Sequence, residues 1–112
     1  PLLETAAREI QEETGLTIEE HDSMHVVNPC LFSSPGMTDE SNALVCAVLH
    51  PEDLSHLTQA GAVGSECFDG FVLLSKAEAQ EILRQGRDAH GMFYSVYTWA
   101  ALLYFVSDLW EQ

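Results

Sequence analysis

Residues 8–16 read Arg-Glu-Ile-Gln-Glu-Glu-Thr-Gly-Leu, and they indicate a helix that ends abruptly at Gly15. Successive helical residues are ~100° apart, so Glu9, Glu12 and Glu13 fall within an arc of about 100°. A separate apolar stripe lies beside that arc and consists of Leu3, Ala6, Ala7 and Ile10. The pattern therefore predicts a helix that packs along one face and presents carboxylates along the next.

The three carboxylates favour a divalent cation. Glu9 lies three residues before Glu12 and four before Glu13, so without a counter-ion these like charges repel one another. They also lie late in the helix, near the negative end of its dipole, where cations rather than anions are stabilised. Bound Mg²⁺ or Mn²⁺ would remove both penalties, since hard divalent cations take oxygen ligands. The alternative is the solvated acidic face of an ordinary helix.

The order of residues around the carboxylates resembles the Nudix box, whose pattern is G-x5-E-x7-R-E-U-x-E-E-x-G-U, where U is a bulky aliphatic residue. The second half of the pattern is matched without interruption by Arg8, Glu9, Ile10, Glu12, Glu13, Gly15 and Leu16. The first glutamate of the box would stand immediately before Pro1, and its glycine further upstream. We therefore expect the chain to begin partway through this motif.

The resemblance implies a role for each matched position. Glu9, Glu12 and Glu13 would be the ligands of Mg²⁺ or Mn²⁺. Arg8 would be a structural arginine, whose planar guanidinium pairs with carboxylates to hold loop and helix together. Gly15 would adopt the positive φ that stops the helix, after which the chain would re-enter the core.

Length and composition predict one small domain, which we place at residues 1–112. The chain has 46% apolar and 20% charged residues, enough for one modest core. Its 4 Lys and Arg against 18 Asp and Glu give a net charge of −14, which repels nucleic-acid backbones and anionic membranes. Nucleic acid and membrane are therefore not expected as partners. A small nucleotide substrate remains compatible, because metal ions can stand between carboxylates and phosphates.

The cysteines indicate a reducing compartment. Cys30, Cys46 and Cys67 are odd in number, form no C-x-x-C pair and lie in or beside apolar stretches, so we expect reduced, mostly buried thiols. This favours a cytoplasmic protein, or a cytoplasmic and nuclear one if the source is eukaryotic. The five histidines are scattered, and no pair has zinc-ligand spacing.

Apolar patterning predicts strands between helices. After the first helix we expect a strand centred on residues 25–27 that ends near Pro29, a central strand at 42–50, a strand at 68–74, a helix from 76 to about 85, and a helix at 92–109. Ser75 and Glu78 form a capping box for the helix that follows them. The last helix, interrupted by Ser95 and Thr98, has roughly 15 apolar-dominated residues, fewer than the ~20 that span a bilayer. We expect it in the core or at a homodimer interface.

These elements predict an α/β or α+β sandwich. The Nudix resemblance narrows the fold to an α/β/α sandwich around a mixed sheet, whose early strands would precede Pro1 and are absent from this chain.

The first of two candidate loops is residues 33–40. Taken alone, its Pro-Gly pair predicts a turn between strands. Beside a Nudix box, however, the loop is similar to the S-P-G-x-[ST]-x-E segment of ADP-ribose pyrophosphatases. The matching positions are Ser34, Pro35, Gly36, Thr38 and Glu40. The resemblance implies that Pro35, Gly36, Thr38 and Glu40 bind substrate.

The second candidate loop is residues 64–69. A glycine-containing loop that delivers a carboxylate is a common way to place a general base. In the similar pyrophosphatases a G-E pair supplies the catalytic glutamate here, which makes Glu66 the candidate, with Ser65 where glycine is expected. Asp69 is the second choice. An ordinary exposed acid is the alternative for either residue.

The implied reaction is hydrolysis of a nucleoside diphosphate linked to another group, with Glu12 and Glu66 as catalytic residues. Metal ions would neutralise the diphosphate and lower the pKa of a bound water, from which Glu66 would take a proton. ADP-ribose would give AMP and ribose 5-phosphate, with nucleotide sugars and NADH as other substrates to consider. Phe32 is a candidate for stacking on adenine, although we favour a place in the core.

Two alternatives stay open. The first is a Nudix-like domain that binds a nucleotide or a partner protein without turnover, which the missing glycine and first glutamate of the box would explain. The second is a structural α/β module whose acidic helix only keeps it soluble.

Overall fold

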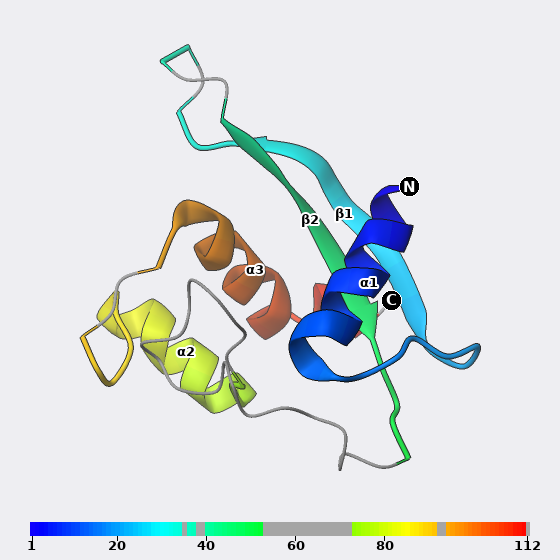
Figure 1. Cartoon of the computed structure of the whole chain (residues 1–112). Helices are drawn as coiled ribbons and strands as arrows, with labels where there is room; N and C mark the ends of the chain where they lie inside the picture. Colours follow the sequence, from blue (N-terminus) through cyan, green and yellow to red (C-terminus); the bar gives the residue numbers. More distant parts are fainter. Residues whose placement is uncertain (35, 38–39, 53–72, 92–93, 112) are drawn as a thin grey trace. The chain divides into compact units, whose positions relative to one another are not determined.

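The chain has a mixed α/β composition, as expected. The computed structural model describes residues 1–34, 36–37, 40–52, 73–91 and 94–111. Its elements are α1 (Leu2–Thr14), β1 (Ser23–Phe32), β2 (Ser41–Val48), α2 (Lys76–Gln85), α3 (Val96–Val106) and the short 3-10 helix η2 (Leu109–Glu111) (Figure 1). They belong to two compact units, residues 1–26 with 45–73 and residues 27–44 with 74–112. The coarse α/β class is therefore confirmed.

The helix α1 ends where the sequence predicts. Gly15 follows it with φ 79° in the left-handed conformation, and its backbone N–H donates to the Gln11 carbonyl. Glycine reaches this conformation without the steric penalty that a Cβ imposes. The Thr14 hydroxyl secures the same end, because it accepts a hydrogen bond of 3.2 Å from the backbone N–H of Leu16. Both signals are local, so the end of the helix could be predicted from the sequence.

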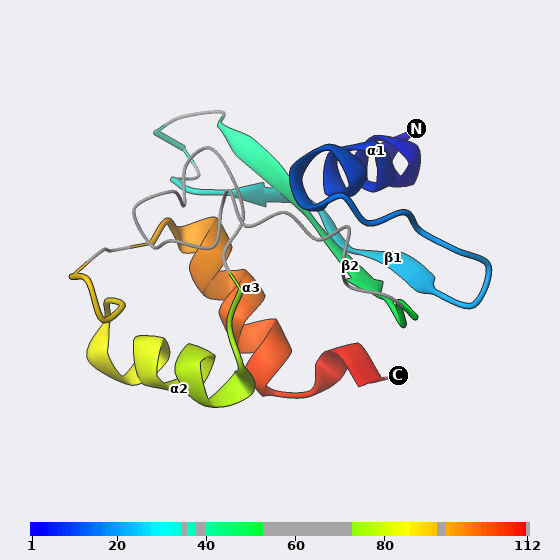
Figure 2. The same ribbon diagram turned by 60° about the horizontal axis from the view of Figure 1, so that its bottom comes forward.

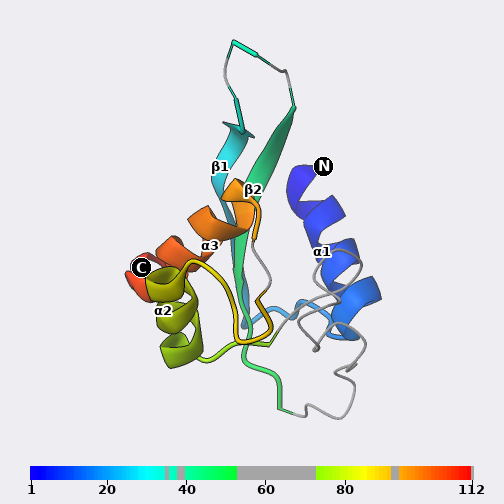
Figure 3. The ribbon, with the colours of Figure 1, turned by 90° about the vertical axis from the view of Figure 1, so that its left-hand side faces the viewer.

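Strands β1 and β2 form a two-stranded antiparallel sheet (Figure 3). The prediction that β1 ends near Pro29 is wrong, since the strand continues to Phe32. Proline lacks a backbone N–H, but an edge strand has one side on which no donor is needed. Within the described residues β1 has β2 as its one neighbour, and Pro29 is exposed.

Strand β2 begins at Ser41 and ends at Val48, close to the predicted 42–50. Its second half, residues 44–48, is half-buried rather than fully buried. A central position would require a second neighbour for β2, and the strand predicted at 68–74 falls mostly outside the described residues. The central position therefore stays a prediction.

Helix α2 confirms the capping box. The Ser75 hydroxyl accepts from the backbone N–H of Glu78 at 3.1 Å, and the Glu78 carboxylate accepts from the backbone N–H of Ser75 at 2.9 Å. These two bonds satisfy donors that the first turn of a helix leaves free. The pKa of the Glu78 carboxyl is lowered, first by the hydrogen bond from the Ser75 backbone N–H and then by the Ser75 side chain, because both favour the charged form. The helix ends at Gly86, which has φ 80°.

Helix α3 is shorter than predicted. It begins at Val96 instead of residue 92, because Ser95 is its N-cap and accepts from the backbone N–H of Thr98 at 3.2 Å. The predicted interruption at Ser95 is therefore wrong, since the helix starts there. Met92 and Phe93 lie outside the described residues. No helix in the described part of the chain is long and apolar enough to cross a membrane.

The described core lies between α2 and α3, which pack against each other (Figure 2). Ala79 and Ile82 of α2 and Leu102 of α3 are buried. Six half-buried side chains surround them: Leu74, Leu83, Tyr94, Trp99, Phe105 and Val106. An ion pair of 2.7 Å from Lys76 to Asp108 ties the start of α2 to the residue before η2.

Candidate functional site

The acidic arc of α1 lies on the surface of the protein. Glu9, Glu12 and Glu13 are exposed, and the helix has no buried residue. Within the described ranges, neither Glu9 nor Glu12 forms an ion pair with a basic side chain. These two carboxylates are therefore not neutralised by a described internal partner. The three glutamates occupy the expected positions on the helix.

The three side chains do not form a ready-made chelate. Among the residues that the structure describes, no three His, Cys, Asp or Glu side chains converge closely enough to hold one metal ion. The oxygen donors nevertheless suit Mg²⁺, which usually keeps several waters and is held by one or two carboxylates together with substrate phosphates. The donor chemistry fits this cation, whereas a cage made by the protein alone is not present among the described residues.

The roles predicted for Arg8 and Gly15 have different outcomes. Gly15 has the positive φ that the motif implies. Arg8 is exposed and has no ion pair with any described residue, so its predicted pairing with carboxylates stays a prediction. Leu16 is half-buried, in agreement with its expected return toward the interior.

The first candidate loop contains a tight turn. The backbone N–H of Met37 donates to the Ser34 carbonyl at 3.0 Å, and Gly36 has φ 85°. Glu40 is exposed, and its carbonyl accepts a hydrogen bond of 3.3 Å from the Tyr97 hydroxyl of α3. Pro35 and Thr38 lie outside the described residues. The turn is confirmed, and the substrate-binding roles stay predictions.

The remaining predicted positions divide into two groups. Glu66, Ser65 and Asp69 lie outside the described residues, so the general base stays a prediction. Phe32 is 49% exposed at the end of β1, so the expectation that it lies in the core is wrong. A strand end next to a turn leaves an aromatic ring with few neighbours, which apolar character alone does not reveal.

The cysteines depart from the expectation of buried thiols. Cys30 is exposed on β1, as is Pro29 beside it. Cys46 is half-buried, and this burial raises the pKa of its thiol. Cys67 lies outside the described residues.

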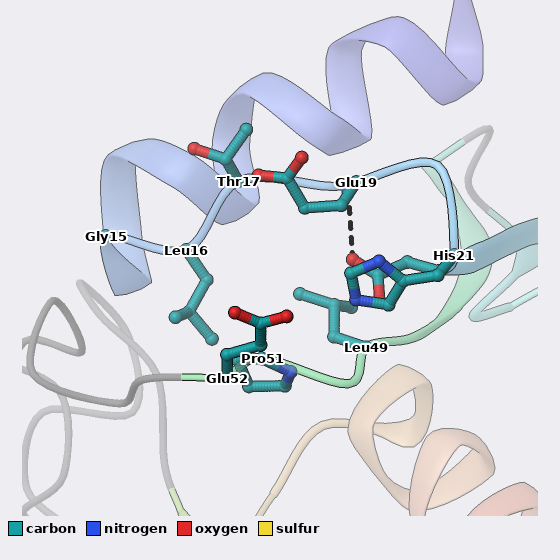
Figure 4. Close-up of a pocket in the computed structure, with 9 residues that line it drawn as sticks. Gly15, Leu16, Thr17, Glu19, His21, Leu49, Pro51 and Glu52 are labelled. Carbon is teal, nitrogen blue, oxygen red and sulfur yellow. Dashed lines mark hydrogen bonds and ion pairs between the residues drawn. The ribbon is translucent and has the colours of Figure 1, made fainter.

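A pocket that sequence reasoning missed lies just beyond the end of α1 (Figure 4). Its volume is about 480 Å³, and it belongs entirely to the first unit. The walls come from the segment after α1 and from the segment after β2: Gly15, Leu16, Thr17, Glu19, His21, Asp22, Leu49, Pro51 and Glu52. No periodicity marks such a site, because its two walls are more than 25 residues apart along the chain.

Asp22 organises one side of this pocket. Its carboxylate accepts from the backbone N–H groups of Glu19, at 2.9 Å, and His50, at 2.8 Å. The His21 ring lies 3.4 Å from the same carboxylate and donates through Nε2 to the His50 carbonyl at 3.0 Å. The backbone donors, with Glu19 first, lower the pKa of the Asp22 carboxyl. An aspartate before a strand is typical of such turns, but its distant partner is not visible in the sequence.

Comparisons of the chain with protein-family models, with curated proteins and with solved structures found no match.

Proposed function

We propose that this protein hydrolyses a nucleoside diphosphate linked to another moiety, in a reaction that depends on Mg²⁺ or Mn²⁺. The substrate we favour is ADP-ribose, with AMP and ribose 5-phosphate as products. One observation carries the proposal. Glu9, Glu12 and Glu13 lie exposed on one helix, in the order of the Nudix box, and a glycine with positive φ closes that helix.

In this proposal the chain's own residues bind and position the substrate. Carboxylates of α1 would hold the cation, which supplies charge neutralisation at the diphosphate. Glu66 would take the proton from the attacking water, and Glu40 and Gly36, with Pro35 and Thr38, would contact the substrate. The cation also reconciles a net charge of −14 with an anionic substrate, since the unaided protein would repel it.

The proposal includes the finer fold and assembly. The β1–β2 hairpin would belong to a mixed sheet in a Nudix-type α/β/α sandwich. The homodimer and the cytoplasmic location are proposed with it, from the apolar last helix and from the cysteine pattern.

The test is release of AMP from ADP-ribose by the purified protein, followed by chromatography. We expect turnover with Mg²⁺ or Mn²⁺ and its loss on addition of a chelator, because charge neutralisation at the diphosphate is removed. Nucleotide sugars and NADH, assayed in parallel, will identify the preferred substrate. Absence of cation-dependent cleavage of all these compounds would overturn the proposal.

A second candidate function is nucleotide or protein binding without turnover. The specific observation that favours it is the lack of three converging metal-binding side chains among the described residues. Calorimetric titration separates the two functions. ADP-ribose that binds with measurable heat and is recovered intact, with and without Mg²⁺, indicates the binding domain.

A further inference from the structure

The pocket beyond α1 is close to the carboxylates proposed to hold the cation. Its first wall residue, Gly15, lies three positions after Glu12 and two after Glu13. At a rise of about 1.5 Å per helical residue, Glu12 and Gly15 are roughly 5 Å apart along the helix axis. The pocket is therefore within reach of the chemical group that adjoins a diphosphate bound at these carboxylates.

The charged groups of the pocket are carboxylates, which accept hydrogen bonds, and one of them already accepts from the protein backbone. In Figure 4 the Glu52 carboxylate lies between Leu16 and Leu49, and the His21 ring lies on the same side as Leu49. Asp22 is not accessible to a ligand, because its side chain is only 2% exposed. Each of its carboxylate oxygens also already accepts a backbone hydrogen bond, from Glu19 or His50. The carboxylates of Glu19 and Glu52 are exposed and keep free acceptor capacity. In Figure 4 the Glu52 carboxylate is the one directed between the apolar side chains, whereas that of Glu19 points toward α1.

The charge of the pocket selects against a phosphate. No Lys or Arg is among the described residues that line it, and it is bordered by the carboxylates of Glu19 and Glu52. The end of α1 adds the negative pole of a helix dipole. A phosphate would be repelled here, whereas a neutral group rich in hydroxyl donors would form charge-assisted hydrogen bonds to Glu52.

The apolar walls define the rest of the ligand. Leu16, Leu49 and Pro51 contribute hydrocarbon surface on both sides of the Glu52 carboxylate. A furanose ring presents C–H groups on its faces and hydroxyl groups at one edge, which matches apolar walls with a single acceptor between them. The volume of about 480 Å³ lies within the range typical of small-molecule sites, ~300–1,000 Å³.

We infer that this pocket binds the adenine-linked ribose of the substrate through its vicinal hydroxyl groups, with Glu52 as the acceptor. Leu16, Leu49 and Pro51 contact the ring, and Asp22 positions the His21 side chain at the edge of the site. This inference rests on the proposed function, to which it adds a substrate subsite made by the segments after α1 and β2.

The experiment uses adenosine, which has the ribose hydroxyls but no diphosphate and needs no cation. Titration into the isotope-labelled protein should shift the amide signals of Leu16, His21 and Glu52. We expect 2′,3′-dideoxyadenosine to bind about tenfold more weakly, because it lacks the two donors that a charged acceptor recognises. Equal binding of both compounds, or shifts confined to other residues, would overturn the inference.

Matched variants localise the effect. Glu52→Gln should weaken adenosine binding about fivefold, because a neutral amide oxygen accepts more weakly than a carboxylate. Glu20→Gln is the control, since Glu20 is an exposed glutamate of the neighbouring loop that does not line the pocket. Equal effects of the two substitutions would show that net charge, and not the pocket, governs binding.

The two proposals fail separately. If adenosine binds as described but ADP-ribose is not cleaved, the proposed function is wrong and the ribose site stands. If ADP-ribose is cleaved with the same KM by the wild-type protein and by Glu52→Gln, the proposed function stands and the ribose site is wrong.

Discussion

Helix α1 and the pair α2–α3 are stabilised in different ways. The 13 residues of α1 include no buried side chain, and its ends are marked by Pro1 and the left-handed Gly15. The pair α2–α3 supplies all three buried side chains of the described core, with Ala79 and Ile82 facing Leu102. Most helical stability in proteins comes from packing of an apolar face rather than from propensity. The comparison indicates that α2–α3 contributes stability, while α1 leaves its carboxylates available for chemistry.

The strongest test of this difference is Leu102→Ala in α3. Removal of a buried leucine side chain leaves a cavity, and we expect the free energy of unfolding to fall by about 2–5 kcal/mol. Urea denaturation followed by circular dichroism measures this change. Leu103→Ala is the control, because Leu103 is 49% exposed on the same helix and should have a much smaller effect. Similar losses for both variants would show that Leu102 does not hold the core.

On α1 the expected effect is on activity. Glu12→Gln and Glu13→Gln should each lower kcat/KM for ADP-ribose by about 100-fold or more, since groups that only support metal ligands already account for 10–100-fold. Both residues are exposed, so the unfolding midpoint should stay close to the wild-type value. Glu4→Gln, an exposed glutamate in the first turn of the same helix, is the matched control. Wild-type rates in both variants would remove the metal-binding assignment.

Helices α1 and α2 both end at a glycine. Gly15 and Gly86 have φ values of 79° and 80°, so alanine at either position is strained and should lower the free energy of unfolding by about 1–2 kcal/mol. At Gly86 an added Cβ would meet no atom within 4 Å, so its loss reflects backbone strain alone. A neutral Gly15→Ala beside a destabilising Gly86→Ala would show that the end of α1 contributes little to global stability.

The smallest expected effect concerns acid stability near the pocket. The folded pKa of Asp22 lies below its ordinary value of 3.8, so its stabilising contribution is complete above that pH and is lost as the pH falls through the folded pKa. The difference in unfolding free energy between wild type and Asp22→Asn should therefore shrink between about pH 5 and pH 3. Urea denaturation at several pH values measures it, with Glu20→Gln as the reference for an exposed acid. A constant difference would contradict the role assigned to Asp22.

Local signals made much of the fold predictable. The predicted bounds of helix α2, from residue 76 to about 85, agree with the structure, because Ser75, Glu78 and Gly86 act within one turn of its ends. The predicted start of α3 is wrong, because Ser95 caps the helix and does not interrupt it, and a serine hydroxyl is a favourable N-cap. The predicted end of β1 near Pro29 is also wrong, because a proline ends a central strand but not an edge strand.

The candidate site was predictable only along one helix. The arc of Glu9, Glu12 and Glu13 follows from helical periodicity alone. The pocket joins segments that are distant in sequence, and Asp22 meets His50, 28 residues away, through backbone donors that any residue type would supply. Such contacts depend on how strands pair, which periodicity does not report.

The contacts of Asp22 also bear on how the hairpin aligns. Asp22 immediately precedes β1, and His50 follows β2 by two residues, so their hydrogen bonds join the ends of the two strands farthest from the turn. A slip of one residue would turn every side chain of a strand to the opposite face. It would also withdraw the His50 N–H from a carboxylate whose side chain is only 2% exposed, and so leave that carboxylate short of a donor. The hydrogen bond between Asp22 and His50 therefore stabilises the observed register of the hairpin relative to misaligned pairings of the two strands.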